Sequence, residues 1–332
     1  MLRLVQLTHP TDGRRVAVVE EPKLNLLSSL ASVFDLARAA ITSNRPLAAV
    51  VEQHRTAESL DYDLVYRLRS PWRLLPPFDH PGDPGRCLVT GTGLTHKGSA
   101  DNRQSMHVGD EIETDSMKMY RIGLEGGRPE PGRIGAAPEW FYKGCGTILR
   151  AHGEPLDAPN FADDGGDEAE IAGAYLIGPD GTPYRVGLVQ GNEFSDHVLE
   201  AKNYAYLAPS KLRTCAVGPE LIVGADFADV PGRIRIERGK AVIWEANLVS
   251  GERAMCHSLA NLEHHHFKYE QHRRPGDAHV HFFGADNFSF RDRVRLEDGD
   301  VMEVAFAGFG RPLRNPVRID RSRQVAVTVK VL

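Results

Sequence analysis

From Arg86 onward, the sequence is patterned for strands rather than for helices. Short runs of apolar and β-branched residues recur between glycine-rich turns, and each run has the length of a strand. These runs cover residues 87–90, 171–177, 185–189, 234–238, 240–246, 278–283, 301–307 and 324–331. The clearest helical pattern among them lies at residues 258–269. This part of the chain can bury a core only by pairing its strands into sheets, which predicts a β-rich domain.

The first part of the chain mixes strands and helices. Two strands are predicted at residues 2–7 and 15–19, and two helices follow, one from a cap at Ser28 or Ser29 to Ile41 and one over residues 47–54. Five prolines between residues 70 and 85 predict an irregular connection. We therefore expect an α+β, β-rich fold with a small mixed domain at residues 1–125 and a larger β-rich domain at residues 126–332.

Composition narrows the class of protein. With 41% hydrophobic residues in a chain of 332, the protein can form an ordinary core and is not disordered throughout. A net charge of −5 argues against nucleic acid as a partner, and no apolar run is long enough for a membrane span. The four cysteines are widely spaced, and the first residues lack the apolar run of a secretion signal. We expect a reduced, cytoplasmic enzyme.

Two glutamates lie at the start of one predicted strand. Glu168 and Glu170 are two residues apart, so they share a face if the strand forms there. Two like charges side by side cost free energy unless a cation balances them, and carboxylate oxygens suit a hard metal ion. The alternative is a solvated acidic loop, because three aspartates lie just upstream.

Two further charged residues follow. Glu193 comes directly after the next predicted strand, where it could complete a set of three carboxylate ligands. The alternative there is ordinary turn chemistry. Lys211 lies between apolar segments, and burial or a nearby dication would favour the neutral amine that a general base needs. A surface lysine is the alternative.

Together these segments resemble the fumarylacetoacetate hydrolase superfamily. The resemblance covers roughly residues 136–318 and rests on four motifs in the family's order. They are Glu168-Ala169-Glu170, Gly191-Asn192-Glu193-Phe194-Ser195, Lys211 through Thr214-Cys215 to Gly218-Pro219, and the segment from Leu296 through Gly299-Asp300 and Gly308 to Asn315-Pro316-Val317. The resemblance implies a rolled β-sheet catalytic domain and a homodimer. It also implies that Glu168, Glu170 and Glu193 bind Mg²⁺, with Mn²⁺ as the alternative.

Departures from the family pattern point to one branch. The third ligand is usually Asp, and here it is Glu193; Ala285 stands where a threonine would contact a substrate carboxylate. The hydrolases' water-activating His and Glu align with Ser99 and Asn102, which are not bases at neutral pH. The 2-keto-3-deoxy sugar acid dehydratase branch instead carries a glutamate upstream, and Glu139 matches it.

The resemblance therefore implies a dehydratase of a 2-keto-3-deoxy sugar acid, most simply a pentonate. Lys211 and Glu139 would be its acid and base, in an order that the sequence leaves open. Substrate contacts are expected from Lys143, Ala285, His96 and His197. One alternative is a metal-dependent C–C hydrolase or decarboxylase of 2,4-diketo acids, and another is a sugar-acid-binding protein without activity.

A group of histidines needs a separate interpretation. They are His264, His265, His266, His272, His279 and His281. Consecutive histidines on a helix point around it, whereas His279 and His281 share a strand face. We interpret the group as packed or hydrogen-bonded, with metal contact as the alternative.

Overall fold

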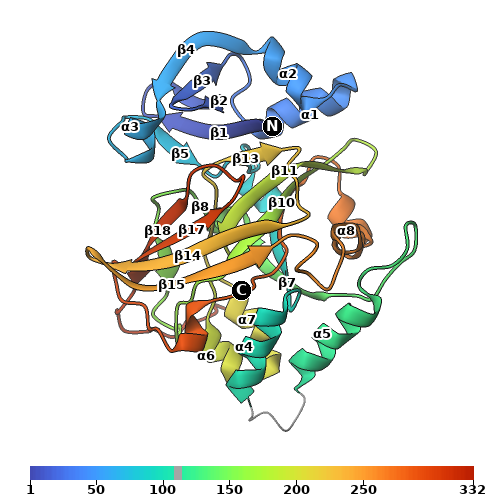
Figure 1. Ribbon diagram of the computed structural model, residues 1–332. Coiled ribbons are helices and arrows are strands. Elements are labelled where there is room, and N and C mark those ends of the chain that lie inside the picture. Colours follow the sequence, from blue (N-terminus) through green and yellow to red (C-terminus); the bar gives the residue numbers. More distant parts are fainter. Residues whose placement is uncertain (108–113) are drawn as a thin grey trace.

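The computed structural model describes residues 1–107 and 114–332, without the side chains of residues 102 and 105–107. Asn102 therefore lies outside the described side chains. The core of the molecule is a 13-stranded sheet whose main path runs β4-β3-β2-β1-β13-β11-β10-β16-β6-β7 (Figure 1). In that order, the strands are Arg55–Asp61, Lys23–Leu27, Gly13–Glu20, Leu2–His9, Leu221–Val223, Pro183–Asn192, Ala169–Ile177, Ala278–Phe282, Cys87–Gly93 and Glu139–Cys145.

Three short strands join this sheet off the main path. β5 (Arg73–Leu75) pairs with β1, and β12 (Cys215–Val217) pairs with β11 and with β8 (Leu149–Arg150). A second, five-stranded sheet has the order β15-β14-β17-β18-β9. Its strands are Ala241–Ser250, Val230–Arg238, Val301–Phe306, Leu313–Ile319 and Leu156–Ala158.

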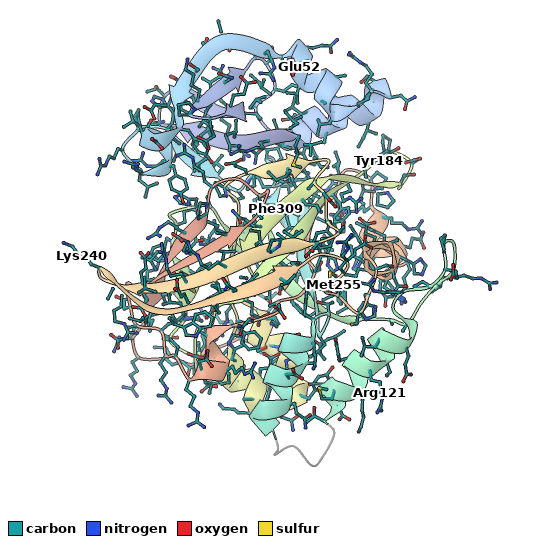
Figure 2. All side chains as sticks on the ribbon, in the orientation of Figure 1. Glu52, Arg121, Tyr184, Lys240, Met255 and Phe309 are labelled. Atoms are coloured by element: carbon teal, nitrogen blue, oxygen red, sulfur yellow. The ribbon has the colours of Figure 1, made fainter. Side chains whose placement is uncertain are left out.

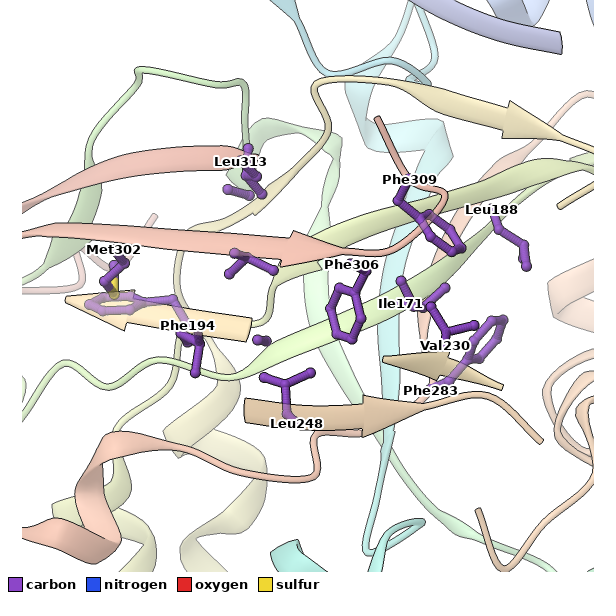
Figure 3. Close-up of a cluster of buried hydrophobic side chains, with 14 of the residues drawn as sticks. Ile171, Leu188, Phe194, Val230, Leu248, Phe283, Met302, Phe306, Phe309 and Leu313 are labelled. Atoms are coloured by element: carbon purple, nitrogen blue, oxygen red, sulfur yellow. The ribbon is translucent and has the colours of Figure 1, made fainter. Parts of the chain in front are cut away.

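The largest apolar cluster lies where the two sheets face each other (Figure 3). Ile171 and Leu188 come from the large sheet, and Val230, Leu248 and Phe306 come from the small one. β10 is buried along its whole length, which explains its nearly continuous apolar sequence. In Figure 2, Phe309 and Met255 lie within the molecule, whereas Lys240 projects from the tip of the β14–β15 hairpin.

The described part of the chain contains eight α-helices. They are α1 (Val33–Ser43), α2 (Leu47–Gln53), α3 (Tyr62–Tyr66), α4 (Lys97–His107), α5 (Asp115–Gly126), α6 (His197–Lys202), α7 (Leu207–Lys211) and α8 (Leu259–Phe267). Of these, α4, α5, α6 and α7 lie at the lower end of the molecule in Figure 1. Short 3₁₀ turns lie at Pro84–Arg86, Gly146–Ile148, Tyr204–Tyr206, Glu270–Arg273 and Ser289–Asp292. No helix in the described part of the chain is long and apolar enough to cross a bilayer.

Several expectations about the first part of the chain need correction. The cap of α1 is Ser32, whose side chain accepts a hydrogen bond from the Asp35 N–H, rather than Ser28 or Ser29. The proline-rich connection contains the strand β5, which pairs with β1. α4 and α5 were not predicted. α4 is polar, and no clear apolar stripe along its sequence indicates a helix.

The division into two domains at residue 125 stays a prediction. β6 lies before that boundary and pairs with β16, which lies after it. The strand expected at residues 324–331 does not form in this chain. Its residues are exposed and pair with no strand of the two sheets. Alternation predicts a strand only where an edge is available for pairing.

The histidine group packs between α8 and β16. The rings of His266 and His281 stack with centroids 4.3 Å apart, and His266 Nε2 lies 3.0 Å from His279 Nδ1. His281 Nδ1 is 2.8 Å from the Thr90 hydroxyl. The groups of described residues that could hold a metal do not include these histidines. Packing and hydrogen bonding therefore account for them.

Candidate active site

Glu168 and Glu170 flank the first residue of β10. Their side chains are 8% and 1% exposed, so the interpretation as a solvated acidic loop is wrong. β10 and β11 are antiparallel, with Glu170 opposite Gly191, and this register places Glu193 beside the pair. One carboxylate oxygen from each of the three glutamates lies within 4.8 Å of the others. The sequence prediction that these residues come together is confirmed.

This group of carboxylates fits a hard divalent cation. Glu170 Oε2 accepts a hydrogen bond from the Gly284 N–H at 2.7 Å, whereas its buried Oε1 has no hydrogen-bond partner. Burial raises the pKa of Glu170 well above its usual range, and the charges of Glu193 and Glu168 add to that rise. Crowded, buried oxygens with an unsatisfied atom are the ligand set that Mg²⁺ prefers.

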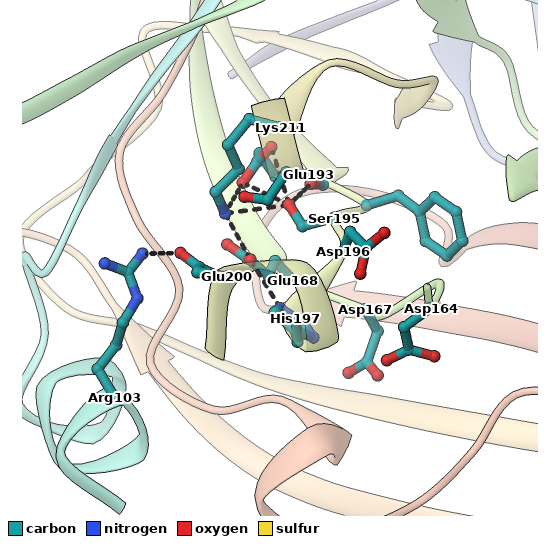
Figure 4. Close-up of polar contacts among 12 residues, drawn as sticks. Arg103, Asp164, Asp167, Glu168, Glu193, Ser195, Asp196, His197, Glu200 and Lys211 are labelled. Atoms are coloured by element: carbon teal, nitrogen blue, oxygen red, sulfur yellow. Dashed lines mark hydrogen bonds and ion pairs between the residues drawn. The ribbon is translucent and has the colours of Figure 1, made fainter. Parts of the chain in front are cut away.

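Lys211, the last residue of α7, reaches into this group (Figure 4). Its Nζ lies 2.6 Å from Glu168 Oε1, 2.7 Å from Glu193 Oε2 and 3.0 Å from the Ser195 hydroxyl. It is buried, so the interpretation as a surface lysine is wrong. Burial acts to lower the pKa of Lys211, but Glu168 and Glu193 outweigh it, and the net shift is upward. Contrary to expectation, burial alone does not give a neutral amine here.

One face of β7 supplies three more groups. Glu139, Phe141 and Lys143 alternate along the strand and are all buried, whereas Tyr142 points outward. Lys143 Nζ lies 2.5 Å from Glu193 Oε1 and donates to the carbonyls of Phe194 and Lys211. The Phe141 ring lies under Lys211, with 4.9 Å from Nζ to the ring centroid. A single strand face thus lines the carboxylate group.

Glu139 lies at the start of β7 and is held by two side chains. Its Oε2 accepts hydrogen bonds from Arg103 Nη1 at 3.1 Å and from the Tyr204 hydroxyl at 2.9 Å. Arg103 also forms an ion pair with Glu200 of α6. Gly93 lies opposite Glu139 in the β6–β7 register, and a side chain there would collide with the carboxylate. Arg103 therefore connects α4, β7 and α6.

The expected substrate contacts have different surroundings. His197 Nε2 lies 2.8 Å from Glu168 Oε1, so this ring orients a carboxylate of the group. Lys143 pairs with Glu193, and Ala285 is buried just after β16, next to the Gly284 N–H that contacts Glu170. His96 is buried beside Thr95, and burial lowers its pKa to about 4. Direct contact of these residues with a substrate stays a prediction.

Sequence reasoning missed Arg103, Glu200 and Tyr204. Each lies in or beside a short helix, and their contacts join residues far apart in the chain, so spacing gives no signal for them. The alternation of Glu139, Phe141 and Lys143 would have revealed the shared face of β7, had a strand been predicted there.

The sequence matches no protein-family model and no curated protein. Solved structures do match it. A hexagonal crystal form of 2-keto-3-deoxyarabinonate dehydratase aligns with a TM-score of 0.72 and 18% identity, over 96% of this chain and 100% of that one. The chain has the fold of this dehydratase. 2-Keto-3-deoxy-D-arabinonate dehydratase complexed with magnesium and 2,5-dioxopentanoate aligns with a TM-score of 0.71 and 18% identity, also over 96% of this chain and 100% of that one.

The dehydratase fold also includes isomerases. The 2-hydroxyhepta-2,4-diene-1,7-dioate isomerase from Mycobacterium marinum aligns over 97% of this chain and 100% of its own length, with a TM-score of 0.58 and 18% identity. The expected fold class is confirmed at the level of a sheet-rich mixed structure that matches these proteins. Because one fold carries several reactions, the reaction has to be argued from the residues of the site.

Proposed function

We propose that this chain is a cytoplasmic, Mg²⁺-dependent dehydratase of 2-keto-3-deoxy sugar acids. The preferred substrate would be a 2-keto-3-deoxypentonate, and the product α-ketoglutarate semialdehyde, which is 2,5-dioxopentanoate. The observation that carries the proposal is the position of Lys211, with its Nζ against Glu168 and Glu193 and above the ring of Phe141. The proposed base and the carboxylates proposed to hold the ion are thus buried and in contact.

Glu168, Glu170 and Glu193 would hold the cation. A bound Mg²⁺ would stabilise negative charge on the keto oxygen of an α-keto acid and so acidify the hydrogens on C3. His197 orients Glu168, and Lys143 balances part of the charge of Glu193. These buried contacts fix the carboxylates before a substrate arrives.

Lys211 and Glu139 share the proton transfers. One removes a proton from C3, and the other gives a proton to the C4 hydroxyl, which leaves as water. Loss of a proton from C5 and return of a proton to C3 then give an enol, and the enol becomes the aldehyde when it gains a proton at C4 and loses the proton of its hydroxyl. Lys211 can act as the base once another cation balances Glu168 and Glu193, because those carboxylates are what raise its pKa. Arg103 and Tyr204 hold the Glu139 carboxylate in place.

The contacts of Ser99 and the pKa of His96 favour dehydration over hydrolysis. A hydrolase must activate water, and the best base for that has a pKa near 7. Ser99 stands at the aligned histidine position, and its hydroxyl donates to the His96 carbonyl at 3.0 Å. Burial lowers the pKa of His96 to about 4, which makes it a weak base at neutral pH. A dehydratase needs no attacking water.

The test is a product assay on the purified protein with Mg²⁺. 2-Keto-3-deoxypentonates of both C4 configurations, a 2-keto-3-deoxyhexonate and an acylpyruvate are compared, with 2,5-dioxopentanoate measured directly. We expect the aldehyde from one pentonate and little acylpyruvate cleavage. Faster cleavage of the acylpyruvate would make the protein a hydrolase, and ligand binding without turnover would make it a binding protein.

A further inference from the structure

The residues at the end of the described chain have the sequence pattern of a strand but pair with nothing in this chain. Residues 324–332 alternate strictly, with Val325, Val327, Val329 and Val331 on one side. These valines are 79%, 94%, 84% and 96% exposed. Among the described backbone hydrogen bonds, none involves residues 324–332. A β-branched row of this kind gains stability only where a sheet edge can pair with it.

The same chain carries a long free edge. β15 is the last strand of the small sheet, and its ten residues make it longer than the other edge strands described, β4, β7 and β9. β4 is polar on both faces, and one face of β7 lines the active site. On β15, Val242, Ile243 and Val249 are 38–48% exposed. An edge with exposed apolar side chains is a template for strand addition.

The backbone of β15 shows which groups remain open. Pro231 lies opposite Val249, and the Pro231 carbonyl accepts a hydrogen bond from the Ala307 N–H on the other side of β14. Pro231 and Val249 are therefore a pair without hydrogen bonds between them, and the backbone N–H and C=O of Val249 point away from β14. The Val249 N–H is taken by Asp286 Oδ2 at 3.1 Å. Glu245 and Asn247 share the outward direction of Val249 and have no described backbone partner on that side. Their N–H and C=O groups can accept a further strand.

We propose that residues 324–332 of one copy of this chain add to the β15 edge of a second copy, and that the second copy returns the same contact. One chain carries both the unpaired segment at residues 324–332 and the free β15 edge, and it does not pair them with each other. Two copies can therefore form both strand pairs across a twofold axis. The valines would continue the apolar face of β15 that carries Trp244, Ala246 and Leu248, which pack on the core. The remaining residues, such as Thr328 and Lys330, would face solvent.

The test measures oligomeric state and hydrogen exchange in the full chain. The mass of the wild-type protein by sedimentation should be twice 36.7 kDa. Removing residues 322–332, or combining Val327→Lys with Val329→Lys, should weaken the dimer at least 10-fold. Thr328→Lys is the matched control, because it adds the same charge on the opposite side, and it should leave the dimer intact. The amides of Glu245 and Asn247 should exchange slowly in the dimer and quickly after truncation.

Two outcomes would overturn the proposal. One is a wild-type protein that is monomeric at micromolar concentration. The other is a dimer whose stability and amide exchange at β15 are unchanged by truncation. Because residues 324–332 contact none of the site residues in the structure, the proposal stands or falls separately from the assigned reaction.

Discussion

Lys143 Nζ lies 2.5 Å from Glu193 Oε1, and neither side chain reaches solvent. Replacing Lys143 with Met removes one of the two lysines that balance the buried Glu193 carboxylate and leaves Lys211 as the other, which costs up to about 3–5 kcal/mol of folding stability. We expect saturating Mg²⁺ to restore part of that loss, because the cation would balance Glu193 instead. Urea unfolding with and without Mg²⁺ measures both effects. If Mg²⁺ stabilises the variant no more than the wild type, Glu193 is not a ligand.

Glu170→Gln tests the proposed ion site by removing the charge of one proposed ligand. The substitution removes one ligand charge and also removes repulsion with Glu168 and Glu193. We expect Mg²⁺ affinity, measured by calorimetry, to fall at least 10-fold while the metal-free protein unfolds at the same urea concentration or higher. Glu263→Gln is the control, because Glu263 pairs with Tyr175 and Arg185 away from the site. Unchanged Mg²⁺ binding by Glu170→Gln would place the ion elsewhere.

Lys211→Ala tests the assignment of the base. We expect turnover to be lost while pyruvate still binds in the presence of Mg²⁺, since the carboxylates remain. Single-turnover assays and pyruvate titration measure the two properties separately. A variant that keeps more than about a tenth of the wild-type rate, a loss of only about 1.4 kcal/mol, would remove Lys211 from that role.

Arg103→Met should disconnect Glu139 from Glu200. We expect kcat to fall about 100-fold, because Glu139 loses the side chain that fixes its position, with a smaller change in Mg²⁺ affinity. Arg38→Met, in an exposed pair with Asp35 on α1, is the control and should keep full activity. Equal losses of Mg²⁺ affinity and of kcat would instead indicate that the whole site had rearranged.

The histidines between α8 and β16 predict a pH dependence of stability. Burial, with smaller effects of His279 and His272, lowers the pKa of His281 from 6.5 to about 3. Between those values the unfolded chain binds a proton that the folded state does not, so stability falls as the pH falls through this window. His281→Gln should reduce the slope by up to about 1.4 kcal/mol per pH unit.

Urea unfolding between pH 7 and pH 5 measures this slope. His264→Gln is the matched control, because His264 lies on the same helix and is only half-buried. A slope for His281→Gln equal to that of the wild type would mean that His281 is protonated in the folded state, or that it is as exposed there as in the unfolded chain.

β10 and β16 were predictable, because their apolar runs are buried on both faces. β10 is the clearest case: its sequence is apolar nearly throughout, and every residue of it is buried. The three glutamates were predictable from motif order, since Glu170 lies at the start of β10 and Glu168 and Glu193 lie directly beside β10 and β11. The contacts of Arg103 were not, because the polar helix α4 is positioned by ion pairs across the site rather than by an apolar face.

The role of Lys211 shows a second limit of sequence reasoning. A lysine between apolar segments left burial and a surface position both open; the structure buries it, and its charge depends on which carboxylates face it. Residues 324–332 show a third limit. Their alternation is the pattern of a strand, but the sequence does not show whether a sheet edge lies where that strand could pair. That depends on how the rest of the molecule folds and assembles.

β6 and β7 are adjacent antiparallel strands, and their register runs up to Gly93 opposite Glu139. A hairpin needs as few as about two residues to join such strands. This chain uses residues 94–138 instead, and Arg103 comes from that stretch. The sheet itself does not require the excursion, while Glu168, Glu170 and Glu193 lie in β10 or directly beside β10 and β11. The connection is thus separable from the strand pairing, and exchanging it between proteins of this fold would test whether it determines which acid the proposed enzyme accepts.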